Sequence, residues 1–285
     1  MLGKLTKHEL FAVGRLAVPA YIGVLIISVV GRFLTWLSSR QYVIDNVPDT
    51  FVKLIKILSS TISFIYIIIF MSLLILTFFM MIYRFYKSFF TDEGYLMMTL
   101  PVRSTSLIFS KLFNSWVWII ASILIAGLSL YITLGHYDSI IDTLKDLWDA
   151  VGRMIDRQGD FIRDELGVPI WVFGLELFAL VFLFVTRTIL SWYASVSFGM
   201  LLSKKHKIVG TIAAYFIIFV VTQIIMAIYL FVITRVVPNY YDVLLSSTGK
   251  ALQITVGGSA LIYLIFSTAL FAFTSHIMTH RLNLD

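Results

Sequence analysis

Two short motifs in this sequence approach known arrangements of catalytic or ligand-binding residues. His276 and His280 stand four apart in HIMTH, so a helix would place both rings on one face, as in zinc-binding helices. The glutamate of HExxH is missing, however, and no inward third ligand accompanies the pair. SSTGKA, residues 246–251, lacks the first glycine of a phosphate-binding loop and has alanine where a hydroxyl would hold magnesium. We therefore expect no catalytic residue, no metal site and no cofactor in this chain.

The composition instead indicates a membrane protein. Of the 285 residues 59% are hydrophobic and 13% charged, there is no cysteine, and the mean hydropathy is +0.93. A helix needs about 20 apolar residues to cross the hydrocarbon core. Six stretches meet that requirement: 16–37, 57–83, 107–135, 168–202, 208–234 and 254–278. Because membrane strands are much shorter, we predict an all-α fold, one polytopic domain over residues 1–285 with six transmembrane helices.

The distribution of Lys and Arg predicts the orientation of these helices. With a cytoplasmic N-terminus, the inner segments hold eleven cations against four acids, and the outer ones nine against eleven. The short KKHK turn at 204–207 decides in favour of this orientation, because charges in short loops count most. Both termini are then cytoplasmic. The basic pI near 9.4 indicates topology and contact with anionic lipid rather than nucleic-acid binding.

Two further helices are expected outside the spans. Residues 5–15 fit an N-terminal interfacial helix, with Leu5, Leu10 and Phe11 able to face lipid. Residues 138–166 place apolar side chains at helical spacing and predict an extracellular amphipathic helix. We interpret it as a cap on the bundle or a helix on the outer headgroups, with a gate for substrate release as the alternative.

Polar residues inside the spans are candidates for the transport path or for helix packing. A charge at the bilayer centre costs about 2.5–3.5 kcal/mol on insertion scales, so it should face protein or water. Arg32 and Glu176 share a depth, and we predict that they pair. For Arg187 and for Gln223 we favour contacts between helices over a polar lining of the path.

The segment TDEGYLMMTLP, residues 91–101, lies between the second and third spans. Thr91 is placed as an N-cap, with Asp92 and Glu93 in a first turn, where the helix dipole favours anions. Pro101 ends the helix, because the residue before proline avoids the α region. The pattern predicts a short helix across the cytoplasmic ends of the two spans. The alternative is an ordinary capped turn without a partner.

The run RFYKSFFTDEGYLMMTLPVRSTSLIFSKL resembles the first cytoplasmic loop of ABC-2 type exporter permeases of Gram-positive bacteria. The resemblance implies half of a dimeric transmembrane domain whose coupling helix docks on a separate ATPase. It implies a docking surface that ends at Pro101 and consists of Thr91, Asp92, Glu93, Gly94, Tyr95 and Leu96.

The implied function is ATP-driven export across the bacterial plasma membrane of amphipathic or hydrophobic peptides, such as phenol-soluble modulins or bacteriocins. The expected partners are two copies of an ATPase, which bind ATP and magnesium, a second permease copy or a similar permease, the substrate and membrane lipids. Multidrug or lipid export is the nearest alternative. An integral-membrane enzyme and an immunity scaffold are the alternatives from other classes.

Overall fold

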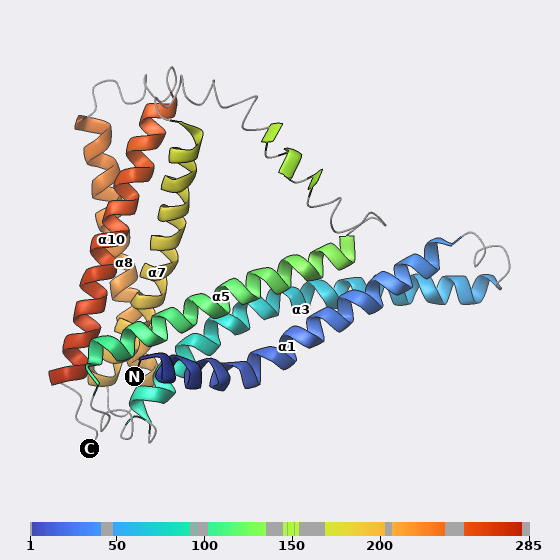
Figure 1. The fold of residues 1–285 in the computed structure, drawn as a ribbon, viewed down its shortest axis with the longest axis horizontal. Helices are drawn as coiled ribbons and strands as arrows, with labels where there is room; N and C mark the ends of the chain where they lie inside the picture. Colours follow the sequence, from blue (N-terminus) through green and yellow to red (C-terminus); the bar gives the residue numbers. More distant parts are fainter. Residues whose placement is uncertain are drawn as a thin grey trace. The chain divides into compact units, whose positions relative to one another are not determined.

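The computed structural model describes residues 2–40, 48–91, 94, 102–134, 145–146, 148–150, 152–153, 169–202, 207–236 and 248–280. The long elements within these ranges are α-helices (Figure 1). They are α1 (Leu2–Ser39), α3 (Asp49–Phe90), α5 (Ser104–Leu134), α7 (Ile170–Leu202), α8 (Lys207–Val236) and α10 (Thr248–His280). Each is long and apolar enough to cross a membrane. The predicted helical class is thus confirmed, and the six predicted stretches coincide with six candidate membrane spans, as in a multi-pass membrane protein.

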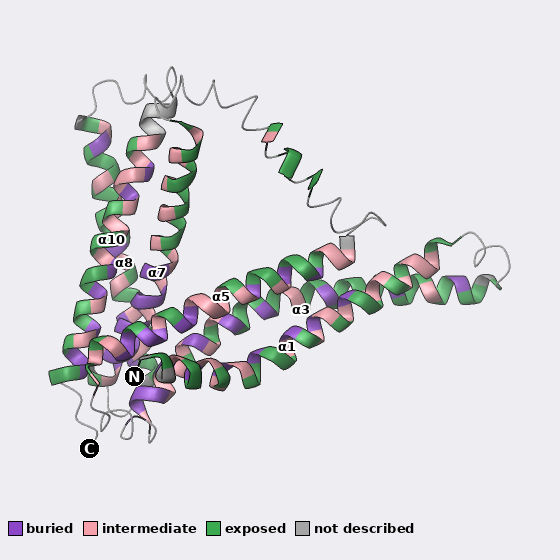
Figure 2. Ribbon diagram, viewed as in Figure 1, coloured by how far each residue is buried: buried purple, intermediate pink, exposed green. Residues whose placement is uncertain are grey.

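The outer faces of these helices carry large apolar side chains. Phe64, Leu124 and Ile265 are 65%, 66% and 65% exposed, and Figure 2 shows exposed residues along every helix. A water-soluble protein would not leave so much contiguous apolar surface open. Lipid is therefore the solvent that suits these faces.

The chain divides into two compact units. Unit 1 comprises Met1–Met98 and Phe109–Asp138, and unit 2 comprises Thr99–Ile108 and Ser139–Asp285. Unit 1 contains α1, α3 and most of α5. Its core cluster is formed by Val13, Ala17, Tyr21, Val24, Tyr66 and Leu73.

A row of serines on α5 joins the three helices of unit 1. Ser122 and Ser129 stand seven residues apart and are buried. The Tyr21 hydroxyl of α1 lies 2.7 Å from Ser122 Oγ, and the Tyr66 hydroxyl of α3 lies 2.6 Å from Ser129 Oγ. Ser122 also donates to Thr77 of α3 over 2.9 Å. Small polar residues let membrane helices approach closely and hydrogen-bond across the seam.

The first two helices of unit 1 differ in whether they contain residues that interrupt a helix. α1 contains Pro19, which removes one helical hydrogen bond, and α1 changes direction along its length in Figure 1. α3 has 42 residues without a glycine or proline. At 1.5 Å per residue it is about 63 Å long, roughly twice the hydrocarbon thickness.

Unit 2 is built on the hairpin of α7 and α8, with α10 packed against α7. A β-carbon on Gly199 would lie 2.4 Å from the Thr211 nitrogen, and one on Gly210 would lie 2.6 Å from the Gly199 oxygen. Only glycine therefore allows the two backbones to meet beside their short connection. Farther along, the rings of Trp192 and Tyr215 stack with centroids 3.9 Å apart.

The structure describes the expected N-terminal interfacial helix fully but only part of the expected helix over 138–166. Residues 5–15 continue into the first span as part of α1, with Phe11 64% exposed, so no break separates the expected interfacial helix from the span. Of the segment 138–166, the described residues 145–146, 148–150 and 152–153 are helical, and Trp148 is 77% exposed. The remainder of that predicted helix lies outside the described residues, as does most of the predicted coupling helix.

Candidate functional site

The turn after α3 begins with Thr91. This residue is extended, with φ −126° and ψ −174°, and its hydroxyl donates to the Lys87 carbonyl over 2.5 Å. Its carbonyl accepts a 2.7 Å bond from the Gly94 N–H. The hydroxyl thus serves the end of α3 rather than a following helix, while the carbonyl accepts a bond as an N-cap carbonyl does. α3 therefore ends abruptly, and the chain turns back at once.

Gly94 is buried against the end of α3. A β-carbon at this position would lie 2.5 Å from the Phe89 oxygen and 2.7 Å from the Phe89 carbonyl carbon. These are main-chain atoms of a helix, so they cannot rotate away as a side chain can. The close approach explains why glycine stands in the middle of this predicted docking surface.

Replacing Gly94 with alanine should displace the turn and lower the free energy of unfolding by about 1–3 kcal/mol, as overpacking does. Thermal unfolding of the purified protein would measure the loss. Gly127→Ala is the matched control, because a β-carbon there meets nothing within 4 Å. An equal effect of both variants would contradict the close-approach argument.

The other predicted docking residues lie outside the described residues. These are Asp92, Glu93, Tyr95, Leu96 and the terminator Pro101. Their role as a docking surface stays a prediction, to which the structure adds the anchoring of Thr91 and Gly94.

A buried ionic cluster lies beside this turn, in unit 1. We call it the Glu9 cluster: Glu9 of α1, Arg84 and Ser88 of α3, and Lys111 of α5. Glu9 Oε2 accepts a 3.1 Å bond from Arg84 Nε, and Glu9 Oε1 forms an ion pair with Lys111 Nζ. Lys111 Nζ also donates to Ser88 Oγ over 2.6 Å. One carboxylate thus holds together the ends of three helices.

The ionic groups of the Glu9 cluster are mostly buried, so their pairing matters for stability. The side chains of Glu9 and Lys111 are only 4% and 3% exposed, and that of Arg84 is 21% exposed. The Lys111 ammonium also lies 5.6 Å from the centre of the Phe89 ring, close to the Gly94 contact. Charge-assisted hydrogen bonds of this kind are stronger than neutral ones, and breaking one strands a buried charge. The cluster thus joins α1, α3 and α5 beside the turn.

The sequence analysis missed the Glu9 cluster. Glu9, Arg84 and Lys111 were counted there only as loop charges that set the orientation. No signal for the cluster is present in the local sequence, because Glu9 follows Lys7 and His8 and Arg84 is followed by Lys87, as expected of solvated helix ends.

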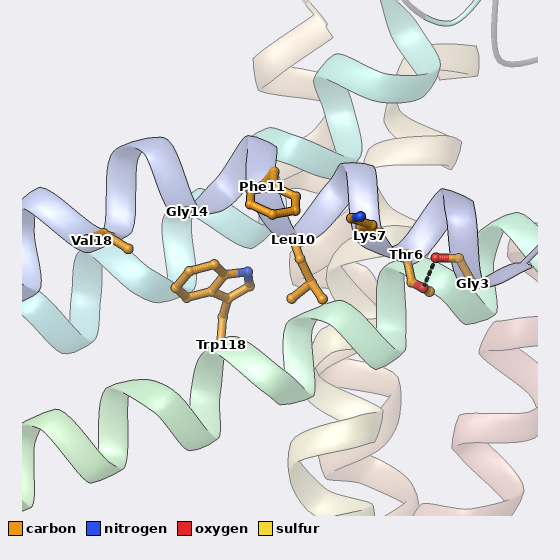
Figure 3. A pocket seen from close by; sticks show the side chains of 8 residues that line it. All are labelled: Gly3, Thr6, Lys7, Leu10, Phe11, Gly14, Val18 and Trp118. Atoms are coloured by element: carbon orange, nitrogen blue, oxygen red, sulfur yellow. Dashed lines mark hydrogen bonds between the residues drawn. The ribbon is translucent and has the colours of Figure 1, made fainter.

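An apolar groove is lined by residues of α1 and by Trp118 of α5 (Figure 3). It has a volume of about 530 Å³, and Leu10, Phe11, Val18 and Trp118 supply its apolar walls. The Trp118 ring reaches toward Gly14, where a β-carbon would lie 3.4 Å from two ring carbons. Its Nε1 is buried without a hydrogen-bond partner among the described residues. The size suits a hydrophobic side chain or acyl segment.

The predicted intramembrane residues fall in different environments. Arg32 lies in unit 1 and Glu176 in unit 2, so the predicted pairing between them stays a prediction. Oε2 of Glu176 is buried and has no hydrogen-bond partner within the described part of the chain. Arg187 is buried at 7% exposure, with its guanidinium carbon 5.9 Å from the centre of the Tyr263 ring on α10. That position favours the interpretation of Arg187 as a contact between helices.

Gln223 and its neighbour Thr222 on α8 differ in burial. Thr222 is 1% exposed, and its hydroxyl donates to the Ile218 carbonyl over 2.7 Å. Gln223 is exposed. Packing within the unit therefore accounts for Thr222, whereas Gln223 presents an amide to the surroundings of unit 2.

The histidine pair is positioned as its spacing predicts. The rings of His276 and His280 stack with centroids 4.7 Å apart near the end of α10. Over the ranges that the structure describes, no group of three metal-ligating side chains is found.

Comparisons of this chain with protein-family models, with curated proteins and with solved structures find no match. Its function is therefore argued from its own residues and contacts.

Proposed function

We propose that this chain is the transmembrane subunit of an ATP-driven exporter of the ABC-2 type in a bacterial plasma membrane. In this proposal the turn after α3 is the cytoplasmic coupling element. A separate ATPase, present in two copies, docks on residues 91–96 and supplies ATP and magnesium. The exported substrate is an amphipathic or hydrophobic peptide.

The observation that carries the proposal is the anchoring of that turn. Gly94 packs on the main chain of Phe89, and the Thr91 hydroxyl is bonded to Lys87. Ser88, two residues before the end of α3, belongs to the Glu9 cluster, which reaches α1 and α5. A push on the turn is thus carried by stiff contacts into three membrane helices at once. An ordinary connecting turn has no need of such bracing.

A second permease copy is part of the proposal. Gln223 is an exposed amide in the middle of an otherwise apolar helix, α8. An amide that faces lipid leaves its hydrogen bonds unmade, whereas a second copy can supply partners. In the dimer, ATP-driven closure of the two ATPases would draw the two turns together and open the path outward.

The substrate class is supported by the groove beside Trp118. Its walls are mostly apolar, with Thr6 and Lys7 at one end, so it suits the hydrophobic part of an amphipathic molecule. The same chemistry suits multidrug or lipid export, which is the second candidate function.

Isolation from native membranes tests the proposal. The full-length chain, purified gently, should bring down an ATPase whose hydrolysis rate rises when an amphipathic peptide is added. Stimulation by a neutral lipid or drug but not by the peptide would favour the second candidate. A chain that copurifies with no ATPase would contradict both and would favour a membrane enzyme or an immunity scaffold.

A further inference from the structure

Arg187 lies about halfway along α7, the first long helix of unit 2. At 1.5 Å per residue it is about 25 Å from Ile170 and about 22 Å from Leu202. Only 7% of the residue is exposed, and its Nε is buried without a hydrogen-bond partner in the part of the chain that the structure describes. A guanidinium group is therefore held near the middle of the membrane, where an unpaired charge is most costly.

Two aromatic rings hold this guanidinium in place but do not neutralise it. Its carbon lies 5.9 Å from the centre of the Tyr263 ring, which packs at 5.6 Å against the ring of Phe184. A helical side chain leans over the preceding turn, which places the guanidinium on the side of Phe184. A ring face attracts a cation more weakly than a carboxylate does, so the contact explains the position of Arg187 and leaves its charge unpaired.

The helices α7, α8 and α10 contain no carboxylate close enough to pair with Arg187. Their one acidic residue is Glu176, three turns earlier on α7 and about 16 Å away along the helix axis. A second copy of this chain would not supply a carboxylate from these helices either. The two-fold axis of a dimer inserted in one orientation runs along the bilayer normal, so the partner's Glu176 lies at the depth of Glu176 itself.

A phospholipid phosphate is also at the wrong depth. The hydrocarbon core is about 30 Å thick, so phosphates lie near the helix ends rather than beside the middle of α7. This leaves a molecule that carries an acidic group into the membrane as the source of a counter-anion. Phe184 is 46% exposed, so such a molecule can reach the aromatic side of the guanidinium from the surface of α7. The rings favour a carboxylate on an apolar body over a small inorganic anion.

We infer that Arg187, Phe184 and Tyr263 form a site in unit 2 that binds the carboxylate of an amphipathic molecule. The guanidinium donates two parallel N–H···O bonds to the carboxylate, a geometry that lysine lacks. The two rings contact the apolar body next to the acidic group. The inference rests on the proposed function, which names an exported peptide as the molecule that enters the membrane. In that setting the site selects peptides with a free C-terminal carboxylate.

The test measures binding to the purified full-length chain in uncharged detergent micelles, without an ATPase, by native mass spectrometry. The probes are a hydrophobic helical peptide whose only acidic group is its C-terminal carboxylate, the same peptide with a C-terminal amide, and dodecanoate. The peptide acid should bind about 30-fold more tightly than the amide, because the amide cannot form the charge-assisted pair of hydrogen bonds. Peptide acid and amide that bind equally well, or failure of all three probes to bind, would overturn the inference.

The variant Arg187→Gln should abolish this preference, so that both peptides bind alike. Without ligand it should also unfold at a higher temperature than the unmodified protein, because no unpaired buried charge remains. A purely structural role predicts the reverse, a lower unfolding temperature with the preference retained. The matched control is Arg235→Gln, which removes an exposed guanidinium of unit 2 whose carbon lies 5.5 Å from the centre of the Phe231 ring. It should keep the preference, and an equal loss in this control would count against the site.

Dodecanoate distinguishes the two sources of a carboxylate. Binding of dodecanoate that depends on Arg187, without binding of the peptide acid, would assign the site to fatty acids and contradict the proposed peptide substrate. Binding of the peptide acid that depends on Arg187, by a chain that copurifies with no ATPase, would support the site and contradict the proposed export mechanism.

Discussion

Replacing Glu9 with glutamine should lower the free energy of unfolding by about 3–5 kcal/mol, the usual cost of removing one partner from a buried ion pair. The change leaves Lys111, with 3% of its side chain exposed, without its carboxylate. The Ser88 hydroxyl and the Phe89 ring still contact the ammonium group but cannot neutralise it. Urea or thermal unfolding of the purified chain in micelles would measure the loss.

A double variant separates the loss of pairing from a general intolerance of change at this position. Glu9→Gln/Lys111→Met removes both charges and should regain most of the stability, because no buried unpaired charge remains and Arg84 is partly exposed. Lys53→Gln, at an exposed position, should change the free energy by less than about 0.5 kcal/mol. A fully stable Glu9→Gln variant, or a double variant no better than the single one, would show that the pairing does not hold the helices.

Replacing Leu96 with glutamate should abolish the substrate-stimulated ATP hydrolysis of the assembled exporter while the chain still inserts. In the proposed complex this side chain enters an apolar cleft of the ATPase, where an unpaired carboxylate would lose its hydration. Each 1.4 kcal/mol of that cost weakens docking about tenfold. ATPase rates with and without peptide, together with the amount of copurified ATPase, would measure the effect.

Two variants control this experiment. Leu96→Met keeps the apolar character and should retain stimulation. Trp148→Glu adds the same charge at a 77% exposed position in the segment expected on the opposite side of the membrane, and it should be neutral for docking. Unchanged stimulation in Leu96→Glu would falsify the assignment of residues 91–96 as the docking surface.

The membrane helices could be predicted from the sequence because length and composition alone determine whether a segment can cross a bilayer. The six predicted stretches fall within or within two residues of the helices observed. The end of α3 could also be predicted, because Thr91, Asp92 and Glu93 follow directly on an apolar and aromatic stretch. The sequence did not predict which face of each helix is buried. α8 is apolar all round, so nothing in its pattern distinguishes the buried Thr222 from the exposed Gln223.

The Glu9 cluster could not be predicted for a different reason. Glu9 and Arg84 lie 75 residues apart, and each stands near a helix end, where charges are usually solvated. Only the packing of three helices brings them together, and the burial of Lys111 follows from the same packing. A count of charged residues can predict which side of the membrane a segment faces. It contains no information on which residues meet in the folded protein. The α5 serines at a spacing of seven were the one local hint of a shared seam.

The unbroken length of α3 has a mechanical consequence. A helix of about 63 Å with no glycine or proline has no residue at which a sharp hinge is expected, so tilting it by about 5° would move its far end by about 5 Å. In the proposed exporter, a small displacement of α3 beside Gly94 would therefore also move the other end of this helix.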